Sequence, residues 1–399
     1  MMKKLFFIIV LLVFAPCFSY AQDTVNLRRK VAQMLIVGFR GTELKKDNPI
    51  YKDIAELNIG GVILFDYDVP SKTRPRNIRS PKQVQQLNSG LQNLAGGRLF
   101  ISIDQEGGYV NRLKERNGFP PARSAKNIGA INNIDSTSFW ASQTAITLHE
   151  LGFNLNFAPN TDVNINPQSP VIGKVERSFS ANPRMVAEHA RAWILQQSEH
   201  GIMNAIKHFP GHGSATADTH LGMADVSNSW SDAELIPFQT LIDSGIVDMV
   251  MTSHIINRKL DSVPATLSYN ILTKLLREQM HYNGIIISDD IAMGAIANHY
   301  PLENALEKAI NAGVDISILS NNGQNFDPKI ATKAVDIICS LVEQGKITPE
   351  RIDEAYNRIM SLKYKNRLNV NPGEFTPHKY YLDNGKSYEI ENTGDILHN

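Results

Sequence analysis

The sequence predicts an α/β protein built as a single (β/α)8 barrel of the TIM type. Eight short apolar segments recur along the chain, each suited to a buried parallel strand, and stretches with helical periodicity separate them. Polar residues follow five of these segments, as expected where barrel strands end at an active-site rim. A doubly wound sheet is the alternative, but eight repeats in about 330 residues fit a closed barrel better.

The expected strands are short and rich in aliphatic residues. They are Met34–Phe39, Gly61–Phe65, Leu99–Ile103, Asn154–Ala158, Met203–Ile206, Val247–Thr252, Gly284–Ser288 and Val314–Leu319. The third to seventh are followed, in order, by Asp104, by Asn160 and Asp162, by Lys207 and His208, by Ser253 and His254, and by Asp289 and Asp290. Because the strands of a barrel are parallel, these side chains are expected to share one rim.

Helical periodicity fills the intervals between the strands, and two further helices are expected after the last one, over residues 329–343 and 349–362. Thr348 and Pro349 supply the second with an N-cap and a first-turn proline. From Asn371 onward the chain is polar with little periodicity. We therefore expect one domain over residues 22–370 and a polar tail over residues 371–399.

The first 21 residues are predicted to be a secretory signal peptide. Lys3 and Lys4 precede an apolar run too short to span a bilayer, and Ser19 and Ala21 occupy the two positions that a signal peptidase reads. The protein is thus expected to be exported and to be periplasmic or secreted. The alternative is a lipid anchor at Cys17.

Charge is balanced, with 40 basic and 40 acidic residues. Removal of Lys3 and Lys4 with the signal leaves 38 − 40 = −2, which argues against a nucleic-acid partner or an anionic membrane held by bulk charge. The two cysteines are Cys17, within the signal, and Cys339, which is expected to be a buried small residue in a helix. We expect a monomer without membrane insertion.

Two loops are long. The loop Asp66–Ser80 is basic, and it either borders a substrate cleft or is a solvated excursion. The loop Asn160–Asn182 carries Arg177 near its end. Loops at this face of a barrel commonly supply binding residues.

Titratable groups are densest between residues 207 and 220. Lys207-His208-Phe209-Pro210-Gly211-His212-Gly213 is followed by Asp218-Thr219-His220. An imidazole can give and take a proton near neutrality, so His220 is the candidate acid/base, and Asp218 is placed to orient it. His212 is expected to be structural within the glycine turn.

Asp289 follows a strand that should be buried on both faces, which would hold its carboxylate rigidly, as a nucleophile requires. Asp290 is expected to point elsewhere and to be structural, because side chains alternate along a strand. Either aspartate would alternatively cap the following helix.

Asp104 precedes the pair Gly107-Gly108, which allows close approach of backbone to a ligand, and its carboxylate suits vicinal sugar hydroxyls. The other candidate sugar-binding residues carry hydrogen-bond donors. They are Arg112, Arg177, Lys207 and His208. Each has the alternative of being a surface ion pair. A zinc site formed by the three histidines and Asp218 is a further alternative, but their spacing matches no compact ligand pattern. Neither a metal nor a cofactor is expected.

These motifs resemble glycoside hydrolase family 3, in its β-N-acetylhexosaminidase branch. The resemblance rests on the 207–220 stretch and on five further segments, and it covers roughly residues 27 to 365. In chain order, which is also the family order, the segments are Asp104-Gln105-Glu106-Gly107-Gly108, Arg177-Ser178-Phe179, Met251-Thr252-Ser253-His254, Pro264-Ala265-Thr266-Leu267-Ser268 and Ile287-Ser288-Asp289-Asp290. Tyr109 stands where the family usually has arginine, and the 66–80 loop is longer than usual.

The resemblance implies a retaining glycosidase with Asp289 as nucleophile, His220 as acid/base and Asp218 as the partner of the histidine. It also implies that the terminal sugar is bound by Asp104, Arg112, Arg177, Lys207 and His208. The expected activity is the exo-acting hydrolysis of terminal β-linked N-acetylglucosamine from peptidoglycan fragments or chito-oligosaccharides. The alternatives are a family 3 β-glucosidase, a metal-dependent barrel hydrolase and a periplasmic sugar-binding protein.

Overall fold

The computed structural model describes residues 27–219, 222–323, 325–370 and 375, and they form a closed parallel barrel. The sheet runs in the order β10-β1-β2-β3-β4-β5-β7-β9, and a parallel bridge between Ile287 and Ile316 joins its two edges. The strands are β1 Leu35–Gly38, β2 Gly61–Ile63, β3 Phe100–Ile103, β4 Leu155–Asn156, β5 Met203–Phe209, β7 Met249–Thr252, β9 Ile285–Ile287 and β10 Ser317–Leu319. The predicted fold class is confirmed.

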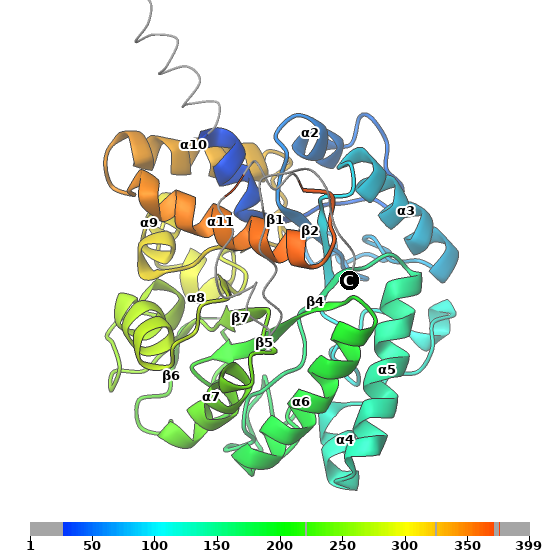
Figure 1. Cartoon of the computed structure of the whole chain (residues 1–399), viewed down its shortest axis with the longest axis vertical. Helices are drawn as coiled ribbons and strands as arrows, with labels where there is room; N and C mark the ends of the chain where they lie inside the picture. The colour runs from blue at the N-terminus through cyan, green and yellow to red at the C-terminus, as the bar shows by residue number, and fades with distance from the viewer. Residues whose placement is uncertain (1–26, 220–221, 324, 371–374, 376–399) are drawn as a thin grey trace, which may run out of the picture.

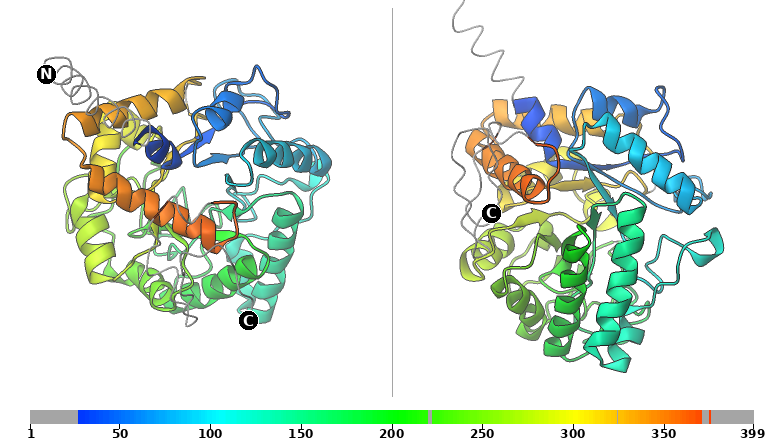
Figure 2. Two further views of the ribbon diagram at one scale, coloured as in Figure 1. Left: turned by 45° about the horizontal axis from the view of Figure 1, so that its top comes forward. Right: turned by 45° about the vertical axis from the view of Figure 1, so that its right-hand side comes forward.

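Helices surround the strands in chain order (Figure 2). The longer ones are α2 Pro49–Ala55, α3 Pro81–Leu94, α4 Ala125–Ile131, α5 Ile134–Glu150, α6 Pro183–Glu199, α7 Ile236–Asp243, the π-helix η4 Asn270–Gln279, α9 Leu302–Ala312, α10 Ile330–Glu343 and α11 Pro349–Lys365. Short elements are η1 Glu115–Asn117, η2 Asp232–Leu235, η3 Ala265–Leu267, α8 Gly294–Ala297 and the parallel pair β6 Ala224–Asp225 and β8 Ile255–Ile256. Their apolar faces and the aliphatic strands share one core.

Strand β5 is longer than the sequence predicts. We expected the apolar strand to end at Ile206, with Lys207 and His208 where the strand meets its loop, but it continues to Phe209, which pairs with Thr252 of β7. Both polar side chains are buried, and each is satisfied by a charged or polar partner, so they lie in the strand without an unpaired polar group. They are consequently held by the barrel wall.

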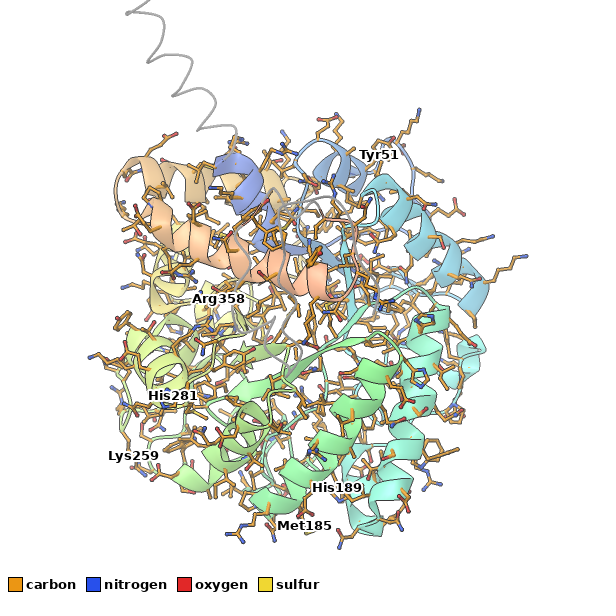
Figure 3. The ribbon with its side chains drawn as sticks, in the orientation of Figure 1. Tyr51, Met185, His189, Lys259, His281 and Arg358 are labelled. Carbon is orange, nitrogen blue, oxygen red and sulfur yellow. The ribbon has the colours of Figure 1, made fainter. Side chains whose placement is uncertain are left out.

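Helix α11 lies across the N-terminal end of the barrel (Figure 1). Lys363 donates to Gln33 Oε1 at 2.7 Å and to the Gly60 carbonyl at 2.9 Å, beside the starts of β1 and β2. Arg358, labelled in Figure 3, reaches Asp315 before β10 at 3.2 Å. Burial lowers the pKa of Lys363 well below its ordinary value. These contacts close the end of the barrel opposite the predicted site.

The other helical expectations are confirmed in detail. The Thr348 side chain accepts from the Arg351 amide as the N-cap of α11, and Cys339 is a buried free thiol in α10. Residues 1–21 lie outside the described residues, as does the predicted tail except for Phe375, which packs against Met360 and Val370. Within the described ranges, none of the helices combines the length and apolar character needed to cross a bilayer.

The basic loop Asp66–Ser80 is folded onto the rim rather than extended into solvent. Asp68 and Thr73 exchange backbone hydrogen bonds at 3.0 and 3.3 Å, which makes a tight hairpin. Arg76, which we expected on a polar loop, is 2 % exposed and donates to the Asn321 carbonyl at 2.9 Å and to Asn322 Oδ1 at 3.0 Å. This buried guanidinium ties the loop to the segment that follows β10.

Candidate active site

A buried network of opposite charges lies where β3 and β5 meet the rim. Lys207 Nζ lies 2.8 Å from Asp104 Oδ1 and 2.7 Å from Glu106 Oε1. Glu106 also accepts two hydrogen bonds from Arg177, from Nε at 2.9 Å and from Nη2 at 2.8 Å. Asp104 and Glu106 follow the end of β3, and the single ammonium of Lys207 bridges their two carboxylates.

Exposure divides this network into a supporting part and an accessible part. The side chains of Lys207 and Glu106 are only 2 % and 4 % exposed, whereas Asp104 is 17 % and Arg112 is 28 % exposed. Arg112 Nη2 lies 3.5 Å from Asp104 Oδ2. Asp104 and Arg112 are therefore the members best placed to touch a ligand, and Lys207 holds Asp104 from behind.

His208 lies in a second buried chain of contacts. Its Nδ1 is 2.7 Å from Asp162 Oδ2, and its Nε2 is 3.1 Å from Arg177 Nη2. A guanidinium can only donate, so Nε2 accepts and Nδ1 carries the proton that Asp162 accepts. In this arrangement His208 orients Arg177.

The charges in the network determine its protonation. Burial would raise the pKa of Glu106, but Arg177 and Lys207 outweigh it and lower that pKa to about 2. Burial would also raise the pKa of Asp104, but Lys207 and Arg112 outweigh it and lower that pKa below its ordinary range. At Asp162, His208 outweighs burial and lowers the pKa in the same way. Asp104, Glu106 and Asp162 are thus anionic at neutral pH.

The two aspartates after β9 have different surroundings. The Asp290 carboxylate accepts from the Ser320 and Ala292 amides at 3.0 and 3.1 Å, and also from the Ser320 hydroxyl. Asp289 is half-buried, and its Oδ1 accepts from the Asp290 amide at 2.8 Å. Asp290 is thus committed to fixing the loop, as predicted, and it caps none of the described helices. Both side chains are half-buried.

The segment that carries the predicted proton-transfer pair lies beside the β9 loop. The Thr219 carbonyl accepts from the Ala295 amide at 3.1 Å, and Thr219 Oγ1 is 3.3 Å from His212 Nε2. Asp218 is half-buried, and its carbonyl accepts from the Gly222 amide at 3.3 Å. His220 lies outside the described residues, and the preceding Thr219 contacts Ala295 of α8, five residues after Asp290. The loop that follows β5 is thus in contact with the segment that follows β9.

The turn at the foot of this segment is clamped from beneath. One oxygen of the buried Glu234 accepts from the Gly213 and Ser214 amides at 2.9 and 3.3 Å. Trp230 Nε1 donates to the Pro210 carbonyl at 3.0 Å. A Cβ at Gly213 would lie 1.7 Å from the Val163 carbonyl oxygen, so only glycine fits there.

His212 and Glu234 are buried titratable groups of this turn. The His212 amide donates to Asp162 Oδ1 at 2.7 Å, and burial lowers the pKa of its ring to about 4. Burial raises the pKa of Glu234 to about 7. The expectation that His212 is structural agrees with this packing.

The structure brings Asp104, Arg112, Arg177, Lys207 and His208 into one network, and it places Asp289 and Asp218 on loops of the same rim. Glu106 and Glu234 were not predicted to belong to the site, and Asp162 was expected on the rim but was given no role there. The two-residue spacing from Asp104 could have identified Glu106, whereas no local signal identifies Glu234. Tyr109 is 65 % exposed.

The arrangement suits the binding of a neutral polyhydroxylated ligand. It offers an accessible carboxylate and guanidinium for hydroxyl groups, with a second carboxylate, Asp289, on the same rim. Among the residues that the structure describes, no three histidine, cysteine, aspartate or glutamate side chains are grouped as metal ligands.

Comparison with known proteins identifies relatives of this chain and of its fold. The model of the glycosyl hydrolase family 3 N-terminal domain matches residues 26–362. The chain is 34% identical to "Beta-hexosaminidase A" of Pseudoalteromonas piscicida over 78% of this chain and 54% of the relative. It is 33% identical to "Beta-hexosaminidase" of Nitrosomonas eutropha, over 73% of this chain and 82% of the relative.

Solved structures give the same result. A glycoside hydrolase family 3 β-N-acetylglucosaminidase from Paenibacillus sp. superposes with a TM-score of 0.77 at 32% identity, covering 89% of this chain and 66% of that one. A β-N-acetylhexosaminidase from Beutenbergia cavernae superposes with a TM-score of 0.73 at 26% identity, covering 85% and 98%. The chain thus spans about half the length of the Pseudoalteromonas relative and about two thirds of the Paenibacillus enzyme.

Proposed function

The chain belongs to glycoside hydrolase family 3, and on that premise we propose that it is an exo-acting, retaining β-N-acetylhexosaminidase. It removes terminal β-linked N-acetylglucosamine from peptidoglycan fragments or chito-oligosaccharides. The observation that carries the proposal is the accessible Asp104–Arg112 pair, braced by buried Lys207, on the same rim as Asp289. The names of the relatives and of the similar solved structures support the choice of sugar.

Binding of the terminal sugar uses charges that are already in place. Asp104 accepts from two adjacent hydroxyl groups, and Arg112 donates to a hydroxyl oxygen. Arg177, oriented by Glu106 and His208, adds donors from the β4 loop. Because these partners hold the side chains before the ligand arrives, little side-chain entropy is lost on binding.

Hydrolysis then proceeds in two displacements. An Asp289 carboxylate oxygen forms a bond to the anomeric carbon while the bond to the leaving oxygen breaks, and His220 gives that oxygen its proton. Water next attacks the anomeric carbon and gives a proton to His220, and the bond to Asp289 breaks. Asp218 holds the imidazole in the orientation that both transfers need.

Two inversions at the anomeric carbon leave the product in the β configuration. The general scheme uses two carboxylates, but here a histidine takes the place of one, so the separation of carboxylates does not predict the outcome. The Asp290 carboxylate, occupied by Ser320 and Ala292, supports Asp289 by fixing the loop. We further propose that residues 1–21 direct export to the periplasm or beyond, and that the protein acts as a monomer.

Release of p-nitrophenol from its β-N-acetylglucosaminide by the purified protein tests the proposal. We expect the wild-type protein to turn over this substrate in the presence of a chelator. We expect the Asp289→Asn protein to show no turnover. Turnover of the β-glucoside in preference would favour a family 3 β-glucosidase, and affinity for the sugar without turnover would favour a binding protein. Proton NMR of the first product should show the β anomer of N-acetylglucosamine.

A further inference from the structure

Two segments of the family pattern, residues 251–254 and 264–268, have no part in the steps proposed above. The first runs from the end of β7 onto the rim, and the second includes the short helix η3. Their polar side chains are fully buried, namely Thr252, Ser253, His254, Thr266 and Ser268. Because buried polar groups require hydrogen-bond partners, the partners of these side chains show which loops the two segments support.

Ser253 holds the start of the loop that leads to the proposed acid/base. Its amide and its hydroxyl both donate to the Phe209 carbonyl, at 2.9 and 3.0 Å. Phe209 is the last residue of β5, and the loop that begins after it leads to Asp218 and His220. The beginning of that loop is therefore fixed against the end of β7.

His254, the next residue, reaches the loop that carries the proposed nucleophile. Its Nε2 lies 2.9 Å from the Asp290 carbonyl oxygen. A carbonyl oxygen can only accept, so Nε2 carries a proton and donates it. The Asp290 amide donates to Asp289 Oδ1 at 2.8 Å, and the Asp290 carboxylate accepts from the Ser320 amide at 3.0 Å. Asp290 is thus held at its carboxylate by Ser320 and at its carbonyl by His254, while its amide supports the carboxylate of Asp289.

Thr266 fixes the orientation and the tautomer of this imidazole. Its Oγ1 lies 2.9 Å from His254 Nδ1, 2.6 Å from Thr252 Oγ1 and 2.8 Å from the Ser253 carbonyl oxygen. That carbonyl already accepts from the Thr266 amide at 3.1 Å, so the hydroxyl hydrogen is available to Nδ1, and the Thr252 hydroxyl donates to Thr266 in turn. A neutral ring that accepts at Nδ1 and donates at Nε2 satisfies this buried chain of hydrogen bonds.

We propose that His254 is a positioning residue, which holds the Asp289 carboxylate in line with the anomeric carbon through the Asp290 carbonyl. The inference rests on the proposed glycosidase function. His254 touches no reacting atom and transfers no proton in the reaction. Ser253 and His254 together link the loop of the acid/base to the loop of the nucleophile, and so they set the spacing between the two groups. Both displacements depend on that spacing, because small errors in the placement of reacting groups slow a reaction strongly.

Steady-state kinetics with p-nitrophenyl β-N-acetylglucosaminide test the proposal. His254→Phe keeps a planar ring in the space but removes the donor to the Asp290 carbonyl. We expect its kcat to fall about 10- to 100-fold while KM stays within about twofold of the wild-type value. In His254→Gln the side-chain amide can replace Nε2 as the donor, so this protein should recover most of the lost kcat. A His254→Phe protein with wild-type kcat, or a His254→Gln protein as slow as His254→Phe, would overturn the inference.

The dependence of kcat on pH separates positioning from proton transfer. Because the His254 ring gives and takes no proton in the proposed steps, the His254→Gln protein should keep both limbs of the wild-type profile at the same pH. Loss of one limb, or a shift of a limb by about one pH unit or more, would show that the imidazole itself transfers a proton and would overturn the positioning role.

His189 supplies the matched control. It is also a fully buried histidine whose Nδ1 lies close to a threonine hydroxyl, at 2.7 Å from Thr137 Oγ1, but it lies on α6. We expect His189→Phe to lower stability in urea unfolding and to leave kcat unchanged. An equal loss of kcat in His189→Phe and His254→Phe would assign the effect to general destabilisation and overturn the inference.

A second variant, Thr266→Val, keeps the proposal testable if His254→Phe does not fold. It removes the hydroxyl that holds Nδ1, and we expect kcat to fall by about threefold or more with KM unchanged. A Thr266→Val protein with wild-type kcat would then overturn the inference. Failure of the proposed function gives a different result, because the wild-type protein itself would release no p-nitrophenol. An active wild type with unaffected variants overturns only the role of His254.

Discussion

Replacement of Glu106 with glutamine is expected to destabilise the protein by about 3 kcal/mol at neutral pH. The carboxylate is 4 % exposed and accepts from Arg177 at 2.8 and 2.9 Å, with Lys207 at 2.7 Å. These cations lower its pKa from 4.5 to about 2, and at about 1.4 kcal/mol for each tenfold change in proton affinity this corresponds to about 3 kcal/mol. Removal of one partner of a buried pair costs about the same, 3–5 kcal/mol.

Urea-induced unfolding, followed by fluorescence and circular dichroism together, measures the effect. The folded pKa is depressed, so the contribution of Glu106 is complete above about pH 4.5 and is lost as the pH falls through about 2. The difference between the two proteins should therefore narrow in acid. The matched control is Glu303→Gln, which weakens an exposed pair with Lys346 at 3.6 Å and should change stability by less than about 0.5 kcal/mol. A Glu106→Gln protein as stable as the control at pH 7 would refute the reasoning.

Three further predictions follow from other buried groups and from the proposed site. Asp315 is fully buried against three arginines at 2.6, 2.8 and 3.2 Å, so Asp315→Asn should lose about 3–5 kcal/mol in urea unfolding at pH 7; an effect under about 1 kcal/mol would contradict this. Burial raises the pKa of Glu234 from 4.5 to about 7. The stability of the wild type relative to the Glu234→Gln protein is therefore highest below about pH 4.5, and it falls as the pH rises through about 7. A difference in unfolding free energy between the two proteins that is the same at about pH 5 and about pH 8 would argue against this. In steady-state kinetics His220→Ala should lower kcat, at least about 100-fold, whereas Lys207→Ala should mainly raise KM by loosening Asp104; full activity of the His220→Ala protein would refute the assignment.

The architecture could be read from the sequence because the strands of a barrel are buried on both faces. Their aliphatic segments stand out, and all eight lie where they were expected. The error at the end of β5 has the same cause, since the pattern of apolar residues stops at Ile206 while the strand continues through Lys207 and His208. Those side chains remain in the strand because Asp104, Glu106 and Asp162 satisfy them, which a local pattern cannot show.

The site was predictable where a charged side chain directly follows a predicted strand, as at Asp104 and Lys207. These residues are 103 positions apart in the sequence, and the barrel brings Lys207 Nζ to 2.8 Å from Asp104 Oδ1. Glu234 was not predictable, because its partners Gly213 and Ser214 lie on a different loop and a glutamate in a short helix normally faces solvent. The burial of Arg76 could not be predicted for a similar reason. A basic loop appears solvated until the buried acceptors of the segment after β10 are known.

The central claim is that Asp289 forms the covalent bond to the sugar while Asp290 holds the loop. A fluorinated N-acetylglucosaminide that slows breakdown of the glycosyl-enzyme, followed by proteolysis and mass spectrometry, locates the bond directly. The account predicts a single sugar adduct on Asp289, absent from the Asp289→Asn protein. An adduct on Asp290, or turnover of the compound with no adduct on either residue, would contradict it.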